Sequence, residues 1–266
     1  MKKHIYSLLA LLVIAVSGCD YYDFDAPQPI DSVSAELAIT DARSAAAARA
    51  GVYDELQDPT LVFDGWLASY LYFSDDCIWQ GTFPTRAEFS NFNVLPANTT
   101  MTAVWNDYYD AINVANNVIE ILPNVEDVTL TDDLRNTYIG EARFARALTY
   151  FHLVQGWGEV PLVTTPTREV NDVLFVPRNS VSEIFDQIIE DAEFARDNIG
   201  SATLGITPAA ANALLARVYM ILGNYPAAET AALAALPADY DATTDNFLED
   251  EIFYLKFNAA DGNSLA

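Results

Sequence analysis

The residue types that most often carry catalysis are scarce in this chain. Beyond residue 19 the only histidine is His152, which lies in an apolar run, where a packed or groove-facing imidazole is more common than a general base. Two histidines and two cysteines form neither an HExxH nor a CxxC motif, so we expect no zinc site of these kinds. The chain also lacks a GxSxG elbow, a Walker loop and a GxGxxG segment. The sequence therefore indicates no catalytic residue, no metal ligand and no cofactor.

Carboxylates are the exception, because the chain contains 38 Asp and Glu residues. Two acids that face a cleft are the arrangement of a glycosidase, and this alternative stays open. For the charged cluster of Glu141, Arg143 and Arg146 we expect structural ion pairs along a packed helix. A further group of aspartates has a spacing similar to that of a calcium loop but lacks the glycine at the sixth position, so we expect no calcium site there. These aspartates are Asp239, Asp241, Asp245 and Asp250.

The N-terminal cysteine carries a different chemistry, which is lipidation. Lys2 and Lys3 form a basic n-region, residues 5–16 are apolar, and small residues precede Cys19, as in a bacterial lipoprotein signal. Cleavage before Cys19 would allow acyl chains on that residue to hold the protein at a membrane. The alternative is an ordinary secretion signal with a chance cysteine. Once Cys19 is lipidated only Cys77 remains, so no intrachain disulfide can form, and we expect Cys77 to be a half-buried small side chain.

Composition excludes several classes of partner. The formal net charge of −25 argues against nucleic acid, whose affinity depends on basic side chains that neutralise phosphates. The same charge argues against a protein that lies flat on anionic lipid. With 266 residues, of which 52% are hydrophobic, the chain can bury the core of one large or two small domains.

We expect three segments along the chain: a signal peptide at 1–18, a polar tether at 19–38, and a helical domain at 39–266. Amphipathic periodicity and capping residues predict helices at 40–57, at 105–122, from 131 to the glycines near 157, at 180–198, and from 207. Small and large residues in 215–235 follow the tetratricopeptide spacing, although a chance helical hairpin would give a similar pattern. The expected fold class is mostly all-α, a tetratricopeptide-like helix-pair scaffold with short loops, an extended connector at 160–163 and a terminal β-like segment at 252–257. Because an unpaired apolar strand at a terminus is unfavourable, we expect the natural domain to continue beyond residue 266.

Several segments together resemble one family, the SusD/RagB outer-membrane lipoproteins of Bacteroidetes-type bacteria. The resemblance implies tetratricopeptide-like helix pairs, an extracellular location and docking on a SusC-like TonB-dependent transporter. It also implies capture of oligosaccharides or similar polymers, with no bond made or broken. The chain is shorter than usual members, which suggests a truncated frame or a reduced member. The matching stretches, in order after the signal, are 105–122, 140–163, 176–195, 207–228 and 251–258.

The resemblance also implies where a ligand binds, on a loop after the first helices, which here is 74–86. An aromatic ring can stack on the apolar C–H face of a pyranose while carboxylate, amide and guanidinium groups bind its hydroxyls. The alternative is that Trp79 and Phe83 only hold the loop against the helices. The candidate ligand-binding residues are Trp79 first, then Asp75, Asp76, Gln80, Phe83 and Arg86.

The leading hypothesis is therefore a non-enzymatic lipoprotein of the cell outer membrane that binds a glycan and delivers it to its transporter. Acidic residues directly after Cys19 resemble the export signals of surface lipoproteins, which favours the outside of the cell. A tetratricopeptide-like lipoprotein that assembles other proteins is the alternative from the structural class, because stacked helix pairs commonly bind proteins.

Overall fold

The computed structural model describes residues 35–74, 77–168, 175–200 and 205–236, and the chain divides into two units, Met1–Ala38 and Ile39–Ala266. In the first unit the described part is the short helix α2, Ala35–Ala38. The described part of the second unit is built from helices, and its one β contact is an isolated antiparallel bridge between Val160 and Asn179. The prediction of a mostly all-α fold is confirmed. Within these ranges, no helix has both the length and the apolar character that a membrane crossing requires.

Several predicted features lie outside the described residues. These are the signal peptide with Cys19, the tether up to residue 34, Asp75 and Asp76, the aspartates between 239 and 250, and the β-like segment at 252–257.

Local capping interactions set where most helices begin. Helix α3, Ala42–Leu56, starts at Asp41, whose carboxylate accepts from the backbone N–H of Ser44 at 2.8 Å while the Ser44 hydroxyl oxygen accepts from the backbone of Asp41. Ser180 and Glu183 form the same reciprocal pair at the start of α9, Val181–Asn198, as predicted. Each of these caps satisfies backbone donors that a helix start leaves unpaired. Thr131 and Thr207 cap α7, Asp132–Trp157, and α10, Pro208–Ile221.

Between α3 and residue 99 the chain forms three short helices that we did not predict: η1, Thr60–Ala68, α4, Ser69–Tyr72, and α5, Pro84–Ser90. Helix η1 is a π-helix, and at its end the backbone N–H of Ser69 donates to the carbonyl of Asp64. Because proline suits the first turn of a helix, α5 begins at Pro84. The expected loop at 74–86 therefore ends at residue 83.

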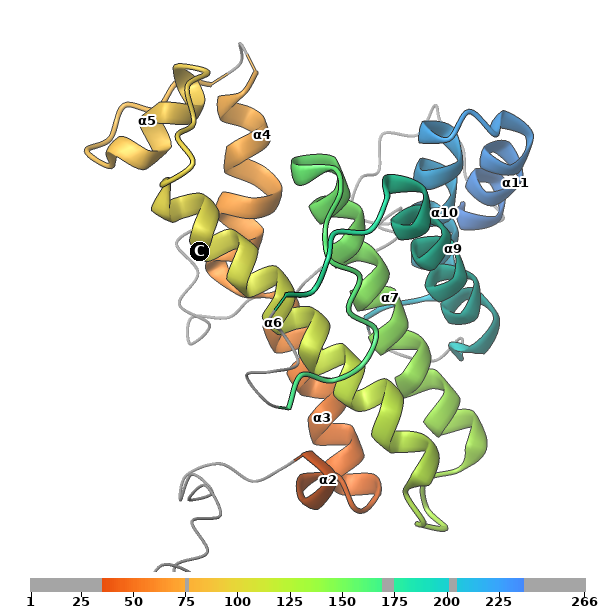
Figure 1. Cartoon of the computed structure of the whole chain (residues 1–266). Helices are drawn as coiled ribbons and strands as arrows, with labels where there is room; N and C mark the ends of the chain where they lie inside the picture. The colour runs from red at the N-terminus through yellow and green to blue at the C-terminus, as the bar shows by residue number, and fades with distance from the viewer. Residues whose placement is uncertain (1–34, 75–76, 169–174, 201–204, 237–266) are drawn as a thin grey trace, which may run out of the picture. The chain divides into compact units, whose positions relative to one another are not determined.

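The longer helices pack in chain order into a stack (Figure 1). Helix α6, Thr99–Ile121, packs on α7, α7 packs on α9, and α9 packs on α10. Helix α10 pairs with α11, Tyr225–Ala235, through a tight turn in which Gly223 has a φ of +74°. This pair is the one that the tetratricopeptide spacing predicted. The largest fully buried side chains of the stack include Tyr108, Ile112, Tyr150, Phe151, Leu153, Ile184 and Ile188.

A buried ionic network joins α6, α7 and α9. Arg146 donates to both carboxylate oxygens of Asp191, at 2.7 and 2.8 Å, and to the side-chain oxygen of Asn116 at 2.7 Å. Burial raises the pKa of Asp191, and the charge of Arg146 partly offsets this effect. Glu141 is also buried, but it pairs with Arg49 of α3. The expected structural ion pairs of Glu141, Arg143 and Arg146 are therefore present, but their partners lie on other helices rather than along α7.

The segment at 159–168, which we call the connector, leaves α7 at Gly158 with a φ of +73°. It runs in an extended path across α6 (Figure 1), as predicted for 160–163. The side-chain amide of Asn116 donates to the carbonyls of Val163 and Thr165 at 3.1 and 3.0 Å. The Tyr150 hydroxyl accepts from the backbone N–H of Val163 at 2.7 Å. Side chains of α6 and α7 thus satisfy backbone groups that have no strand partner.

Candidate functional site

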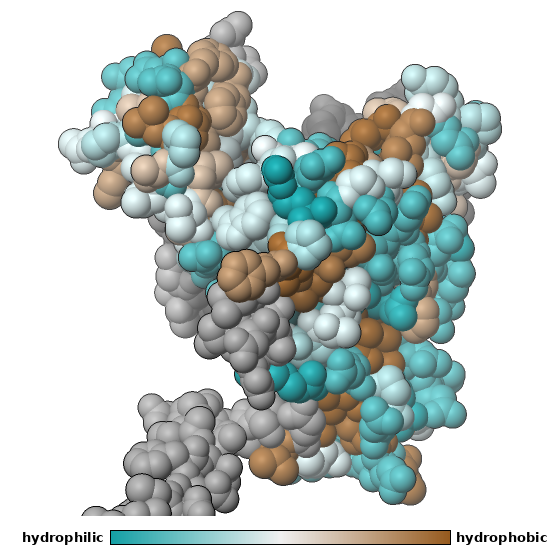
Figure 2. Space-filling model, viewed as in Figure 1, coloured by the Kyte–Doolittle hydropathy of each residue, from teal (hydrophilic) through white to brown (hydrophobic). Residues whose placement is uncertain are grey.

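Aromatic side chains gather around α4, α5 and the loop between them. Hydrophobic residues are visible on the surface of this region in Figure 2. Neighbouring rings in the group lie 5.3 to 6.2 Å apart between centroids, which is the range for aromatic contacts. We call this group the aromatic cluster. It consists of two sets of contacting rings, one of Tyr72, Trp79 and Phe83 and the other of Phe73, Phe89 and Phe92.

Trp79, the first candidate, is half-buried inside the aromatic cluster. Its backbone N–H donates to the hydroxyl of Ser90 at 2.9 Å, and its indole meets the edge of Tyr72 at 5.8 Å. The indole also lies directly over Gly81, where a Cβ would come within 2.1 Å of the ring. Its indole nitrogen is buried without a hydrogen-bond partner among the described residues. Trp79 therefore helps to hold the loop, and Gly81 provides the space for its ring.

Arg86 lies in the first turns of α5 rather than in the loop. Its Nε and Nη2 donate to the two carboxylate oxygens of Asp64 in η1, both at 2.8 Å. Its guanidinium also lies 5.2 Å from the ring centroid of Trp79 and 5.3 Å from that of Phe83, within cation–π range. The Asp64 carboxylate raises the pKa of Arg86 above its ordinary value. Arg86 is thus a charged support for both rings, fixed in place from η1.

The exposed aromatic surface comes from other members of the cluster. Phe83 is 60% exposed, Phe92 is 63% exposed and Phe73 is 46% exposed. Gln80 is also exposed. Exposed ring faces can contact the apolar C–H face of a sugar, and an exposed amide can bind hydroxyl groups.

Sequence reasoning missed Phe73 and Phe92. Phe73 directly follows α4 and Phe92 follows α5 in the left-handed region, with a φ of +53°. The ring centroid of Phe73 lies 5.3 Å from that of the buried Phe89 and 6.2 Å from that of Phe92. The short spacing of Phe89 and Phe92 in the sequence was the available signal.

His152 is packed among aromatic rings on α7. Its ring stacks on Trp66 of η1 with 5.0 Å between centroids and 19° between planes, and Tyr70 lies 6.3 Å away. Its Nδ1 is buried and has no hydrogen-bond partner among the described residues. Burial, followed by the nearby charge of Arg217, lowers the pKa of His152 to about 3. The imidazole is therefore neutral near pH 7, as expected for a packed side chain.

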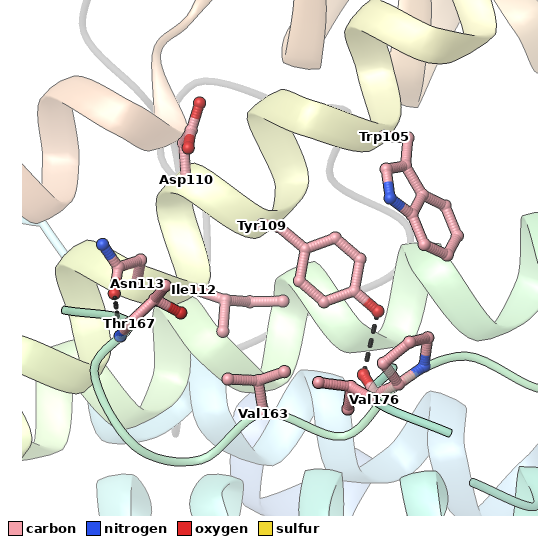
Figure 3. Close-up of a pocket in the computed structure, with 9 residues that line it drawn as sticks. Trp105, Tyr109, Asp110, Ile112, Asn113, Val163, Thr167 and Val176 are labelled. Atoms are coloured by element: carbon pink, nitrogen blue, oxygen red, sulfur yellow. Dashed lines mark hydrogen bonds between the residues drawn. The ribbon is translucent and has the colours of Figure 1, made fainter. Parts of the chain in front are cut away.

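A separate concavity lies between α6 and the connector, and we call it the α6 groove (Figure 3). It has a volume of about 380 Å³ and contains none of the candidate residues of the loop. In the described ranges, no group of three or more His, Cys, Asp or Glu side chains is arranged to hold a metal ion.

The helix pairs stack into a scaffold, and aromatic rings are exposed around α4 and α5, so the protein is a helical scaffold protein with an aromatic surface. The chain belongs to the SusD-like family, because the family model described as "Starch-binding associating with outer membrane" matches residues 74–220. SusD-like proteins are a family of carbohydrate-binding proteins associated with the outer membrane.

Individual relatives support this assignment. The chain is 31% identical over 180 residues to SusD-like protein P38 of Formosa agariphila. The matched region covers 64% of this chain and 35% of that protein. It is 26% identical over 234 residues to SusD-like protein P2 of the same organism, which covers 85% of this chain and 44% of that one. A solved structure of a laminarin-binding SusD-like protein superposes with a TM-score of 0.64 at 26% identity, over 74% of this chain and 43% of that chain. The chain thus spans less than half the length of these relatives.

Proposed function

We propose that this protein is a non-enzymatic, lipid-anchored outer-membrane protein that binds an oligosaccharide at the aromatic cluster and passes it to a SusC-like TonB-dependent transporter. The observation that carries the proposal is the set of exposed rings, with Phe83 5.3 Å from the guanidinium of Arg86, in a member of the SusD-like family. The laminarin-binding relative supports a glycan as the class of ligand.

The proposal assigns a role to each segment of the chain. Residues 1–18 direct export, Cys19 carries the lipid, and 19–38 form a tether. Residues 39–266 form the binding domain. Several acyl chains on Cys19 give stable attachment, where a single chain would give only marginal attachment.

At the aromatic cluster, Phe83 and the accessible part of Trp79 provide the faces on which a sugar ring stacks. Gln80, together with Asp75 and Asp76, binds its hydroxyl groups. Arg86 keeps both rings in position because Asp64 holds its guanidinium from the other side. A site whose rings are fixed before binding loses less conformational entropy when the ligand arrives.

The test is affinity electrophoresis and calorimetry of the purified full chain with laminarin, xyloglucan oligosaccharides and starch. We expect binding to at least one of these neutral glycans. Removal of an aromatic anchor in Phe83→Ala or Trp79→Ala should weaken it at least about fivefold, which corresponds to about 1 kcal/mol. Tyr225→Ala is the matched control, because Tyr225 is 68% exposed on α11, away from α4 and α5. Unchanged affinity in both cluster variants would place the ligand elsewhere.

The partner and the anchor need their own test. A tagged chain recovered from detergent-solubilised outer membrane should bring a large TonB-dependent barrel with it, and Cys19→Ala should release the protein from the membrane fraction. Recovery of a different protein, with no glycan bound, would favour the alternative of an assembly protein. Release of reducing sugar from a bound polysaccharide would show an enzyme instead.

A further inference from the structure

The α6 groove has the size and shape of a small-molecule site. Its volume of about 380 Å³ falls in the range of about 300–1,000 Å³ that is usual for such sites. Trp105, Tyr109 and Ile112 of α6 line it at spacings of four and three residues, so they share one face of the helix. Trp105 to Asn113 spans eight residues, or about 12 Å of helix. The groove is therefore elongated along α6.

One end of the α6 groove is aromatic and the other is polar. Trp105 lies toward one end, Asp110 and Asn113 lie toward the other, and Tyr109 and Ile112 lie between them (Figure 3). Pro161, Val163 and Val176 complete an apolar floor. This arrangement offers ring faces and hydrogen-bonding groups to the same ligand.

Hydrogen bonds fix the walls of the groove before any ligand binds. The Tyr109 hydroxyl donates to the carbonyl of Pro161 at 2.8 Å. The ring of Trp105 lies 5.0 Å from that of Tyr109 and meets Trp157 at 5.5 Å in a T-shaped contact. The side-chain amide of Asn116 also holds the connector, by donating to the carbonyls of Val163 and Thr165. The aromatic platform is therefore preorganised.

The orientation of Asn113 leaves a donor for a ligand. Its side-chain oxygen accepts from the backbone N–H of Thr167 at 2.8 Å. Its Nδ2 then faces away from that bond (Figure 3). Asp110, an exposed residue at the same end, supplies a carboxylate that can accept hydrogen bonds.

Charge favours a ligand without negative groups. Among the described residues that line the groove, none is Lys or Arg. The one charged side chain among these lining residues is Asp110, and its charge is negative. A uronate or a sulfate would meet this negative field without a counter-charge.

We propose that the α6 groove is a second saccharide subsite, which holds a neutral pyranose unit with its C–H face on Tyr109 and Trp105 and its hydroxyls on Asp110 and Asn113. This inference rests on the proposed function but concerns a different surface from the aromatic cluster. An oligosaccharide long enough to occupy both sites at once would bind more tightly than either site alone would hold it.

The test follows the four tryptophan indole N–H signals of the full chain by ¹⁵N NMR during titration with laminarin oligosaccharides. The Trp105 signal, assigned with Trp105→Phe, should move, and it should still move in Trp79→Ala. Alginate oligosaccharides, which are anionic, should not move it.

Two nearly isosteric variants test the polar end. Asp110→Asn removes the charge, and Asn113→Asp keeps the acceptor for Thr167 but removes the donor. Each should raise the dissociation constant measured from the Trp105 signal about tenfold. This is the effect expected for a lost hydrogen bond to a charged group or for added negative charge. Asp186→Asn, at an exposed acid of α9, is the control and should have no effect.

The outcomes separate the two proposals. Movement of the Trp79 signal without Trp105 would overturn the second subsite and leave the proposed function standing. Equal movement of Trp105 with alginate would overturn its preference for neutral units. No movement of either signal with any neutral glycan would overturn both.

Discussion

Protonation of His152 should destabilise the fold as the pH falls. The pKa of His152 is about 3 in the folded chain, against about 6.5 for an ordinary histidine in the unfolded chain. Below pH 6.5 the unfolded state therefore binds a proton that the folded state does not, and stability is lost. At pH 5 the loss from this one group is at most about 2 kcal/mol, or about 4–8 °C in Tm for a domain of this size.

The measurement is urea unfolding, followed by circular dichroism, of the parent chain and two variants between pH 7.5 and pH 5. His152→Phe keeps a ring on Trp66, and His152→Gln keeps a polar side chain, but neither can be protonated. Comparison with these variants is necessary because 38 carboxylates also titrate at low pH in every version of the protein. Relative to each variant, the parent should lose up to about 2 kcal/mol of unfolding free energy between pH 7.5 and pH 5. A difference that stays constant with pH would refute a neutral, buried imidazole.

Four further perturbations test the scaffold, each by urea unfolding. Asp191→Asn leaves Arg146 without its charge partner in the core and should cost about 3–5 kcal/mol, whereas Asp186→Asn on the same helix should change stability by less than about 0.5 kcal/mol. Ser180→Ala removes one half of a capping box and should cost about 1 kcal/mol. Gly158→Ala should cost about 1–3 kcal/mol from the backbone conformation alone, with φ at +73° and ψ at −115°, because a Cβ there meets nothing within 4 Å. Gly156→Ala, inside the helix and equally free of neighbours, should instead stabilise the chain by up to about 1 kcal/mol.

Features that depend on nearby residues were predictable from the sequence. The caps at Asp41, Ser180 and Thr207 and the stop at Gly158 each involve groups within a few positions of one another, so their sequence pattern is sufficient. The helix pair at 215–235 was predictable for the same reason, since its small residues recur within two turns.

Features that join distant segments were not predictable. Glu141 pairs with Arg49, which lies 92 positions earlier. On a helix, Glu141 faces neither Arg143 nor Arg146, because those residues are two and five positions away rather than three or four. The approach of Asp64 to Arg86 likewise depends on a π-helix for which no local pattern was apparent.

The α6 groove was overlooked for a related reason. Trp105, Tyr109 and Ile112 form an apolar stripe at helical spacing, which usually indicates core. The polar residues Asp110 and Asn113 at the edge of this stripe were the signal that part of it faces an open surface. Only the path of the connector shows that surface to be hollow.

The way the connector is held also affects how freely its sequence can vary. Asn116, Arg146 and Tyr150 bind its main-chain groups at Val163 and neighbouring residues, and none of these bonds uses a connector side chain. Substitutions along the connector can therefore change the lining of the groove beside it without changing its path. One scaffold could in this way acquire different ligand preferences by drift in a ten-residue segment, while the three anchoring side chains stay fixed.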